Sequence, residues 1–304
     1  MENALVALSD ELAATVERAS RYVVSVHGRP RISSSGVWWK KGVVVTAEHT
    51  LRRDEDIQVA LSDGKTVTAQ LAGRDGGTDL AVLKLEDRNS GEGASEQAED
   101  LQAGNLVLAV GRSPESGAIA ALGMISTIGG AWHTWRGGRL DQLIRLDLGL
   151  YPGSSGGAVV NAAGKFIGIA TPALSRTTPL AIPVATIDRI TKELLEKGRV
   201  ARGYFGVGLQ PVTLPEHLKS KLNLPEAHGL IVLSVEPDAP AGKAGVVIGD
   251  IFVAFNGEPA SDTDDVQAVL GPEFLGKSVR ASIVRGGELR EMSIVVGEKP
   301  RRRS

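Results

Sequence analysis

The chain has 304 residues, of which 42% are hydrophobic and 23% are charged, the composition of an ordinary globular protein long enough for two domains. The formal net charge of −2 excludes an electrostatic basis for binding nucleic acid or an anionic membrane surface. The absence of cysteine excludes disulfide bonds, cysteine nucleophiles and thiolate metal sites.

The first residues do not read as a targeting segment. They include Asp10, Glu11 and Glu17 and no apolar core of signal-peptide length, and no later run approaches the roughly 18 apolar residues of a membrane span. As written, the sequence predicts a cytoplasmic protein, or a periplasmic or extracytoplasmic one if a leader has been removed. Apolar residues at helical spacing within 4–19 predict a short amphipathic helix, and we assign 1–20 to an N-terminal helical segment.

Two sets of short strands follow, because runs rich in Val and Ile are broken by Gly, Asp, Asn and Ser. An acidic, solvated linker over about 86–104 separates them. Two similar β-units joined by a linker predict two barrels packed together. The strands are expected over 22–27, 36–39, 43–46, 57–61, 66–74 and 80–85, then over 106–111, 118–128, 143–147, 158–160, 166–171 and 180–182.

A helix over 187–197, ended by Gly198, closes this first domain, which we assign to 21–198. The remaining pattern, over 199–298, predicts a separate β-rich module with its own core and two helices, near 215–221 and 262–270. A basic tail over 299–304 reads as a solvated terminus.

Three residues in this order carry the chemistry: His49, Asp79 and Ser155. A serine hydroxyl is a poor nucleophile at neutral pH and needs an imidazole to take its proton and a carboxylate to hold that imidazole. The order is that of chymotrypsin, whereas other hydrolase folds place the three groups differently. His49 and Asp79 fall on the first β-unit and Ser155 on the second, so a cleft between the barrels would assemble the site.

Three runs resemble the motifs of HtrA-type (Deg) serine proteases, which are ATP-independent, chymotrypsin-fold enzymes of protein quality control and stress response. They are 42–49 (GVVVTAEH), 79–84 (DLAVLK) and 152–157 (PGSSGG). Residues 180–183 and 202–207 continue the resemblance into a PDZ domain, so that it covers roughly 20–298. It implies a mainly β fold, with a chymotrypsin-like double six-stranded β-barrel followed by a PDZ domain.

The resemblance also implies roles for single residues. His49 would be the general base, Asp79 its orienting carboxylate and Ser155 the nucleophile, with the backbone N–H groups of Gly153 and Ser155 forming the oxyanion hole. The chain departs from the family at Ser154, where Asn is usual, and at Glu48, where a small or amide residue is commoner. It also lacks the N-terminal aromatic cluster that joins these proteases into trimers, so a homo-oligomer rests on resemblance alone.

Spacing predicts the specificity of the protease site. In chymotrypsin-fold proteases the floor of the primary pocket lies six residues before the nucleophile, which is Gly149 here, flanked by Leu148 and Leu150. No acid stands at this floor, so a basic substrate residue would be buried without a partner. The expected preference is for small or medium aliphatic residues before the scissile bond.

In the C-terminal module, Tyr204, Phe205, Gly206 and Val207 resemble the carboxylate-binding loop of PDZ domains. Backbone N–H groups around a glycine can capture a chain-terminal carboxylate while the bound peptide adds as a β-strand. The alternative is a module that only contacts the protease domain.

The sequence therefore predicts a serine endopeptidase that cleaves unfolded or misassembled proteins through an acyl-enzyme on Ser155. It needs no metal, nucleotide or other cofactor, and its partners are peptide substrates and peptide C-termini, with no nucleic acid and no membrane span. The alternative function is a chaperone-like or PDZ adaptor protein whose protease site is weak or conditionally assembled. An esterase of another fold is disfavoured by the order of the three residues.

Overall fold

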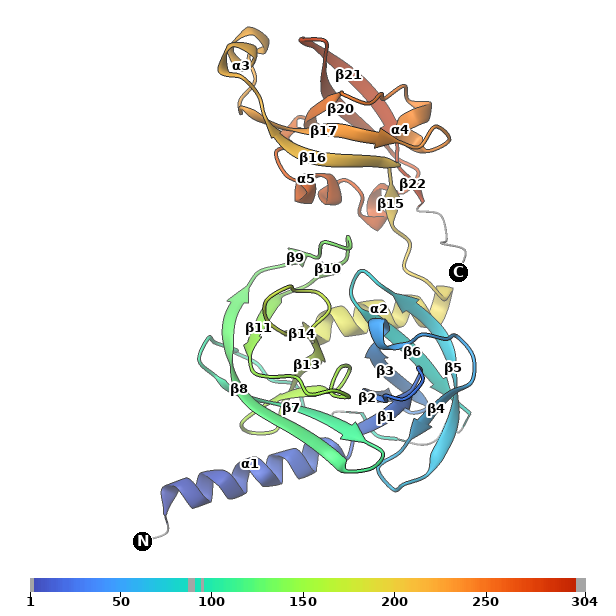
Figure 1. Cartoon of the computed structure of the whole chain (residues 1–304), viewed down its shortest axis with the longest axis vertical. Coiled ribbons are helices and arrows are strands. Elements are labelled where there is room, and N and C mark those ends of the chain that lie inside the picture. Colours follow the sequence, from blue (N-terminus) through green and yellow to red (C-terminus); the bar gives the residue numbers. More distant parts are fainter. Residues whose placement is uncertain (1–2, 87–90, 94–95, 299–304) are drawn as a thin grey trace. The chain divides into compact units, whose positions relative to one another are not determined.

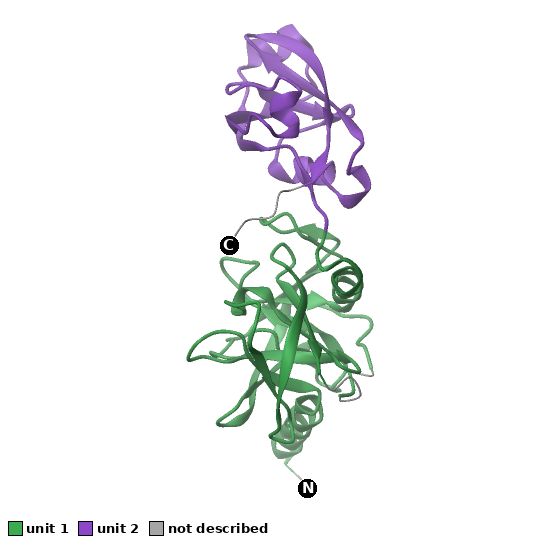
Figure 2. Ribbon diagram, turned by 90° about the vertical axis from the view of Figure 1, so that its right-hand side faces the viewer, with its two compact units in different colours: residues 1–200 green, residues 201–304 purple. Residues whose placement is uncertain are grey.

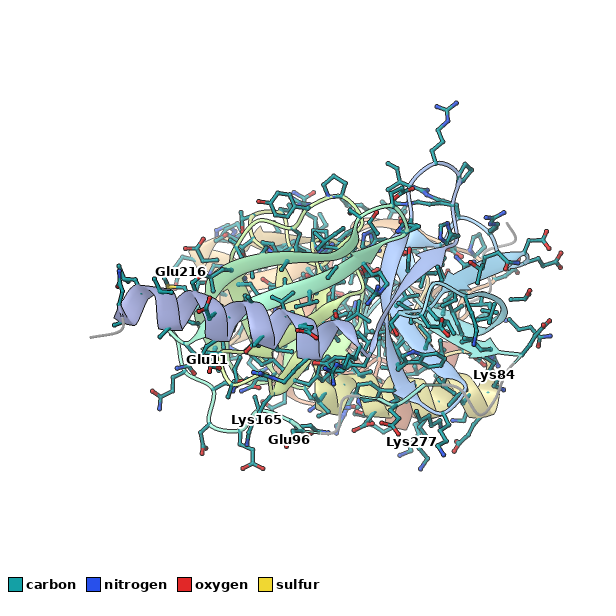
Figure 3. All side chains as sticks on the ribbon, turned by 90° about the horizontal axis from the view of Figure 1, so that it is seen from below. Glu11, Lys84, Glu96, Lys165, Glu216 and Lys277 are labelled. Carbon is teal, nitrogen blue, oxygen red and sulfur yellow. The ribbon has the colours of Figure 1, made fainter. Side chains whose placement is uncertain are left out.

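The computed structural model describes residues 3–86, 91–93 and 96–298, so the expected linker lies partly, and the basic tail wholly, outside the described residues. The chain divides into two compact units, Met1–Val200 and Ala201–Ser304 (Figure 2). Charged side chains such as Glu11, Lys84 and Lys165 are exposed and point outward from the ribbon (Figure 3).

The first six strands of unit 1 form a closed barrel in the order β1-β2-β3-β6-β5-β4 (Figure 1). Its core consists mostly of buried Val, Ile and Leu side chains, together with Trp38, and β-strands favour branched and aromatic side chains because these pack well on a pleated surface. The strands are β1 (Val23–His27), β2 (Ser34–Lys40), β3 (Val43–Ala47), β4 (Ile57–Ala60), β5 (Thr66–Asp75) and β6 (Leu80–Leu85).

The next six long strands form a second closed barrel in the order β11-β14-β13-β12-β7-β8. A small hairpin, β9 (Trp132–His133) with β10 (Arg139–Leu140), lies between β8 and β11 in sequence, and the sequence pattern does not predict it. The barrel strands are β7 (Leu106–Ser113), β8 (Gly117–Gly129), β11 (Leu143–Asp147), β12 (Ala158–Asn161), β13 (Phe166–Thr171) and β14 (Leu180–Pro183). Two six-stranded barrels confirm the fold class expected from the sequence.

One hydrophobic cluster joins the two barrels. It combines Val45 and Val82 of the first barrel with Val110 and Ile169 of the second, all buried. Helix α2 (Val184–Lys197) closes this core with Ile187, Ile190 and Leu194. The helix starts three residues earlier than predicted, directly after Pro183, and ends at Gly198, whose φ of 71° is left-handed.

Helix α1 (Ala4–Ser20) packs against β7 and β8 through its C-terminal half, where Leu12 and Val16 are half-buried. Its N-terminal half extends away from the barrels (Figure 1), and Leu5, Val6 and Leu8 are exposed. The predicted apolar stripe is therefore only partly covered within this chain.

Among the described residues, no helix combines the length and the apolar character that a membrane span requires.

Unit 2 contains one sheet in the order β16-β17-β18-β20-β21, with β19 added to β18, and helix α5 near the edge strand β16. Its core stacks Phe252 and Phe205 on Phe255, with ring centroids 5.1 and 5.9 Å apart. The elements are β15 (Gly203–Tyr204), β16 (Val207–Thr213), α3 (Glu216–Leu222), β17 (His228–Val235), α4 (Pro240–Lys243), β18 (Ile251–Phe255), β19 (Glu258–Pro259), α5 (Thr263–Ala268), β20 (Ser278–Arg285), β21 (Glu288–Val295) and β22 (Gly297–Glu298).

Candidate active site

His49 lies on η1 (Glu48–Thr50), a single 3₁₀ turn that follows β3. The turn is held at both ends, because the Thr50 hydroxyl donates to the Ala47 carbonyl at 2.7 Å and the Glu48 N–H donates to the Asp79 carbonyl at 3.0 Å. The backbone N–H of His49 itself donates to Asp79 Oδ1 at 2.8 Å. The orientation of His49 is thus tied to the loop that carries Asp79.

The Asp79 loop is built to hold one buried carboxylate. Asp79 has a φ of 57°, in the left-handed region that Asp tolerates better than most residues. The preceding turn is fixed by Asp75, whose carboxylate accepts the Thr78 hydroxyl at 2.7 Å and the Thr78 N–H at 3.1 Å. This arrangement turns the chain sharply between β5 and β6 and presents the Asp79 side chain to His49.

The Asp79 carboxylate is fully buried and accepts three donors: the His49 N–H, the His49 ring and the Thr171 hydroxyl. His49 Nδ1 lies 2.8 Å from Oδ2. Because an ionised carboxylate only accepts, Nδ1 carries the proton and Nε2 is left as the basic nitrogen. The pair therefore has the geometry of a general base with its orienting acid.

Thr171 was not singled out from the sequence, although it completes the surroundings of Asp79. It ends β13 of the second barrel, yet its hydroxyl donates to Asp79 Oδ2 in the first. The same hydroxyl accepts the N–H of Ala173 at 3.0 Å, which fixes its direction. A threonine at the end of an apolar strand carries no signal of this role, because the contact spans 92 positions of sequence.

Glu48, one of the departures from the family pattern, does not face the His49 ring as an unpaired acid. Its carboxylate lies 3.5 Å from Arg74 on β5, and Arg74 also donates to the Leu51 carbonyl at 3.3 Å and pairs with Asp54. This cluster attaches the His49 turn to the wall of the first barrel.

Ser155 lies on a tight loop between β11 and β12. Ser154 N–H donates to the Tyr151 carbonyl at 3.0 Å, and Gly153 has a φ of 94°. A four-residue turn with Pro152 second and a positive-φ glycine third has the features of a type II turn. Gly156 is also left-handed, and a Cβ on it would overlap the backbone of Ser35. Only glycine fits this close approach.

The loop leaves two backbone donors available. Within the described residues, neither the N–H of Gly153 nor that of Ser155 donates to a protein acceptor. The carbonyl groups of the same two residues are occupied, since both accept hydrogen bonds from Ser35 of β2, at 2.7 and 3.0 Å. Two free N–H groups flanking Ser154 are what an oxyanion requires.

The predicted site residues are brought together unequally. His49 and Asp79 are in direct contact, whereas no hydrogen bond joins Ser155 to His49 in the described part of the chain. The Ser155 loop connects to the pair through Gly156, whose N–H donates to the Ala170 carbonyl at 2.9 Å, one residue before Thr171. Hydrogen bonds between a nucleophile and its base are often long or poorly aligned before substrate binds.

The residues expected to form the specificity pocket follow β11. Leu148 and Leu150 are half-buried against the core of the second barrel, which contains Ile125, Ile144 and Leu146. Gly149 is exposed, and a Cβ on it would have open space around it. Asp147 ends the strand with an exposed side chain.

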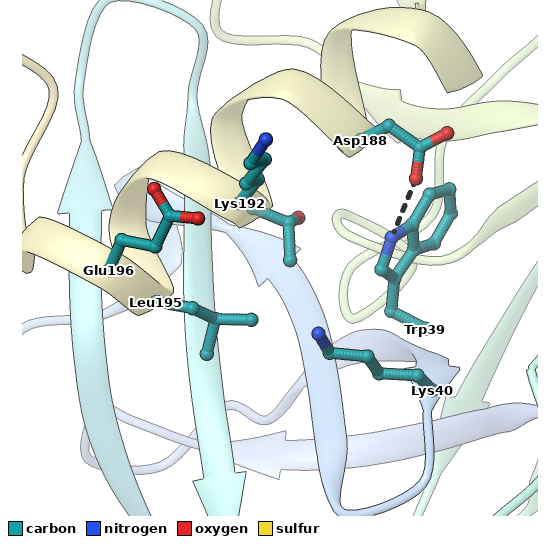
Figure 4. Close-up of a pocket in the computed structure, with 7 residues that line it drawn as sticks. Trp39, Lys40, Asp188, Lys192, Leu195 and Glu196 are labelled. Carbon is teal, nitrogen blue, oxygen red and sulfur yellow. Dashed lines mark hydrogen bonds between the residues drawn. The ribbon is translucent and has the colours of Figure 1, made fainter.

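A cavity of about 560 Å³ lies elsewhere on unit 1 (Figure 4). The Trp39 indole N–H donates to Asp188 at 3.1 Å on one side of it. None of its lining residues is a predicted site residue, so this hollow takes no part in the arrangement above. It is lined by Trp39, Lys40, Asp188, Thr191, Lys192, Leu195 and Glu196.

In unit 2, the loop 204–207 leads into the free edge of β16. The Phe205 side chain belongs to the core, whereas the backbone turns at Gly206, with a φ of 77°. In the described chain no protein acceptor takes the N–H of Phe205 or Gly206. Burial, together with a hydrogen bond to Glu236, raises the pKa of the Tyr204 phenol to about 12, so it stays neutral.

Comparison with known families identifies both units. Residues 34–169 match the family described as "Trypsin-like peptidase domain", and residues 203–296 match "PDZ domain". The chain is 29% identical over 276 residues to the serine endoprotease DegS of Haemophilus influenzae, an alignment that covers 88% of this chain and 78% of DegS.

It is 31% identical over 279 residues to a probable periplasmic serine endoprotease, DegP-like, of Rhizobium meliloti. That match covers 90% of this chain but 54% of the relative, so the chain spans about half the length of this protein. Among solved structures, the HtrA-type protease AlgW with a tripeptide superposes with a TM-score of 0.74 at 30% identity, covering 95% of this chain and 98% of that one.

Proposed function

The chain belongs to the HtrA-type serine endoproteases, with a trypsin-like peptidase domain followed by a PDZ domain, and from this premise we propose that Ser155, His49 and Asp79 form its catalytic triad. We assign the protease domain to 21–198 and the PDZ domain to 199–298. The observation that carries the proposal is the buried Asp79 carboxylate, which holds His49 Nδ1 at 2.8 Å and so fixes the tautomer that a general base needs.

In the proposed reaction, Ser155 Oγ attacks the scissile carbonyl carbon while His49 Nε2 takes the hydroxyl proton. The negative charge that develops on the carbonyl oxygen is stabilised by the N–H groups of Gly153 and Ser155. Collapse of the tetrahedral intermediate breaks the C–N bond, and His49 gives its proton to the leaving amine. Water then hydrolyses the acyl-enzyme by the same route, so the cycle consumes no ATP.

A fluorophosphonate probe and unfolded casein test this proposal. Wild-type protein is expected to be labelled on Ser155 and to cleave casein within the range from about pH 6 to pH 9, because the attack needs a neutral imidazole to accept the hydroxyl proton. The Ser155→Ala variant should do neither, and it serves as the matched control because only one oxygen is removed. A wild-type protein that is neither labelled nor active across this range would overturn the assignment.

The specificity proposal rests on the absence of a carboxylate among Leu148, Gly149 and Leu150. We propose cleavage after small or medium aliphatic residues such as Val, Ala or Leu, because a substrate Arg or Lys would lose its hydration without gaining a partner. Peptide substrates that differ only in the residue before the scissile bond measure this directly. A higher kcat/KM for Arg than for Val would contradict it.

For the PDZ domain we propose that the N–H groups of Phe205 and Gly206 bind the terminal carboxylate of a peptide that adds to β16 as an extra strand. The free edge of β16 supports this, since no strand among the described residues pairs with its backbone groups on that side. Full-length Ser155→Ala protein, which should not degrade the ligand, is expected to bind free-carboxylate peptides more tightly than C-terminally amidated ones. Equal binding of both forms would contradict capture of the chain end.

A chaperone-like or adaptor function is the second candidate, because among the described residues no hydrogen bond joins Ser155 to His49. In that case activity would depend on a ligand that draws the serine toward the base. Cleavage that rises when a C-terminal peptide is added, with labelling of Ser155 rising in parallel, would support conditional assembly.

Unfolded or misassembled protein is the proposed substrate class, by resemblance to the family.

A further inference from the structure

We propose that Ser35 of β2 is a positioning residue for the loop 153–156, here called the oxyanion loop. Ser35 keeps this loop in the conformation in which the N–H groups of Gly153 and Ser155 are available to bind an oxyanion. The inference rests on the proposed protease function and adds to it a side chain outside the triad. Ser35 belongs to the first barrel and is completely buried, whereas the loop that it contacts belongs to the second.

Ser35 donates two hydrogen bonds to the oxyanion loop. Its hydroxyl donates to the Gly153 carbonyl at 2.7 Å, and its backbone N–H donates to the Ser155 carbonyl at 3.0 Å. These two carbonyls belong to the peptide planes immediately before and after the plane that carries the Ser155 N–H. The intervening plane is also held by its own carbonyl, since the Gly157 N–H donates to the Ser154 carbonyl at 3.0 Å, so Ser35 acts on it together with this bond.

The orientation of the Gly153 N–H also depends on the hydrogen bond from the Ser35 hydroxyl. The peptide plane between Gly153 and Ser154 is held at both ends, because its carbonyl accepts from Ser35 and its N–H donates to the Tyr151 carbonyl at 3.0 Å. This hydrogen bond closes the turn in which Gly153 has a φ of 94°. Loss of the Ser35 hydroxyl frees one end of the plane and lets the turn change type, which would redirect the Gly153 N–H.

Ser35 is itself held in one orientation. Its hydroxyl oxygen accepts the N–H of Arg112 on β7 at 2.9 Å, and its carbonyl accepts the Thr46 hydroxyl at 2.6 Å. A hydroxyl has a single proton, and with Arg112 as donor that proton is directed to Gly153. The Arg112 guanidinium is anchored in turn on the carbonyls of Val23 and Ser20, both at 2.7 Å.

The chain offers a matched control at Ser25. This residue lies directly opposite Ser35 in the antiparallel pair of β1 and β2 and is equally buried. In the described residues its hydroxyl has no hydrogen-bond partner. Ser25→Ala therefore removes the same atom from the same part of the core without touching the oxyanion loop.

The experiment compares wild type, Ser35→Ala, Ser35→Thr and Ser25→Ala with a peptide substrate and with a peptide boronate, whose tetrahedral adduct mimics the transition state. Ser35→Ala is expected to lower kcat about ten- to hundredfold, at most as much as the loss of one oxyanion donor. The affinity for the boronate should fall by a similar factor. KM should change little. The midpoint of the pH profile should not move, because Ser35 does not contact His49.

Ser25→Ala should retain wild-type kinetics, and Ser35→Thr, which keeps the hydroxyl, should exceed Ser35→Ala in kcat when both fold. A Ser35→Ala variant with wild-type kcat and boronate affinity would overturn the inference while leaving the protease assignment intact. Equal losses in Ser35→Ala and Ser25→Ala would assign the effect to core packing and also overturn it. Wild-type protein that fails to react with fluorophosphonate would instead refute the proposed function, and this inference with it.

Discussion

The Asp79 carboxylate illustrates how a single buried charge is made tolerable. An isolated carboxylate in a protein interior is very costly, and its burial is compensated only when donors satisfy its oxygens. Asp79 has three such donors, two from His49 and one from Thr171. Because two donors come from the first barrel and the third from the second, the charge is fully compensated only when the barrels are packed together.

Thr171→Ala is expected to lower kcat/KM about ten- to hundredfold, since hydrogen bonds to charged groups contribute about 1.5–3 kcal/mol and about 1.36 kcal/mol corresponds to a factor of ten. Thr171→Ser keeps the hydroxyl and should retain most of the activity. Kinetics with a peptide substrate, alongside melting temperatures, separate this effect from unfolding. A Thr171→Ala enzyme as fast as wild type would show that the hydroxyl does not support Asp79.

At the scale of elements, the end of α2 depends on one backbone conformation. Gly198 donates to the Leu194 carbonyl at 2.9 Å and has a left-handed φ of 71°. A Cβ there would lie 3.5 Å from the Ala72 carbonyl oxygen, an ordinary contact. The cost of a side chain at this position is therefore conformational rather than steric.

Gly198→Ala should lower the free energy of unfolding by about 1 kcal/mol, the usual difference between glycine and alanine at a left-handed helix end. Gly130→Ala is the matched control, because Gly130 has open space around it and no positive φ. Denaturant unfolding followed by tryptophan fluorescence reports on this unit. No difference between the two variants would contradict the conformational explanation.

An ion pair with a buried carboxylate lies beside the sheet of the PDZ domain. Asp250, just before β18, is fully buried and accepts two hydrogen bonds at 2.7 Å from Arg285 on β20. Burial alone would raise the pKa of Asp250. The hydrogen bonds from Arg285 and from the Val247 N–H, with the positive charges of Arg285 and Arg290, together outweigh burial and lower the pKa below its usual value. An aspartate with a depressed folded-state pKa contributes stability above its unfolded pKa and loses that contribution as the pH falls.

The stabilisation from Asp250 should therefore be present above about pH 4, the usual range for an unfolded aspartate, and disappear as the pH falls through the lower folded-state pKa. Asp250→Asn is expected to be less stable than wild type at neutral pH and to show a smaller loss on acidification. Hydrogen exchange of the β18 and β20 amides localises the effect, since the tryptophans all lie in the first unit. Parallel pH dependences of the two proteins would contradict this role.

For the whole molecule, sequence patterns predicted the regular elements better than the contacts between them. The barrel strands were expected because runs such as 43–46 and 80–85 combine apolar residues with turn residues at their ends. The hairpin β9–β10 was missed, because two-residue strands among glycines carry no periodicity, and because Thr134 is held by a distant acceptor, the Gly77 carbonyl, at 2.7 Å.

The candidate site shows the same division. The order of His49, Asp79 and Ser155 could be read along the chain, since the chemistry needs those residue types. Thr171 and Ser35 could not, because an ordinary Thr or Ser acquires its role only from what folding brings beside it. The pairing of Glu48 with Arg74 likewise depends on the register between β3, β6 and β5.

The cluster that joins the barrels also suggests that the protease unit can be made from two chains. Val45 and Val82 on one side meet Val110 and Ile169 on the other, so fragments broken between β6 and β7 should recognise each other through this apolar surface. Neither fragment alone should react with fluorophosphonate, and mixing them should restore labelling of Ser155 in a concentration-dependent way. Failure to restore it with folded, associated fragments would contradict this expectation.

Such complementation would make the enzyme a two-part reporter. One fragment would carry the base and its acid, the other the nucleophile and the threonine that steadies the acid, so a signal would require docking to within hydrogen-bond distance rather than mere proximity. If the two fragments were fused to two candidate binding proteins, binding of these proteins to each other would be detected as fluorophosphonate labelling of Ser155.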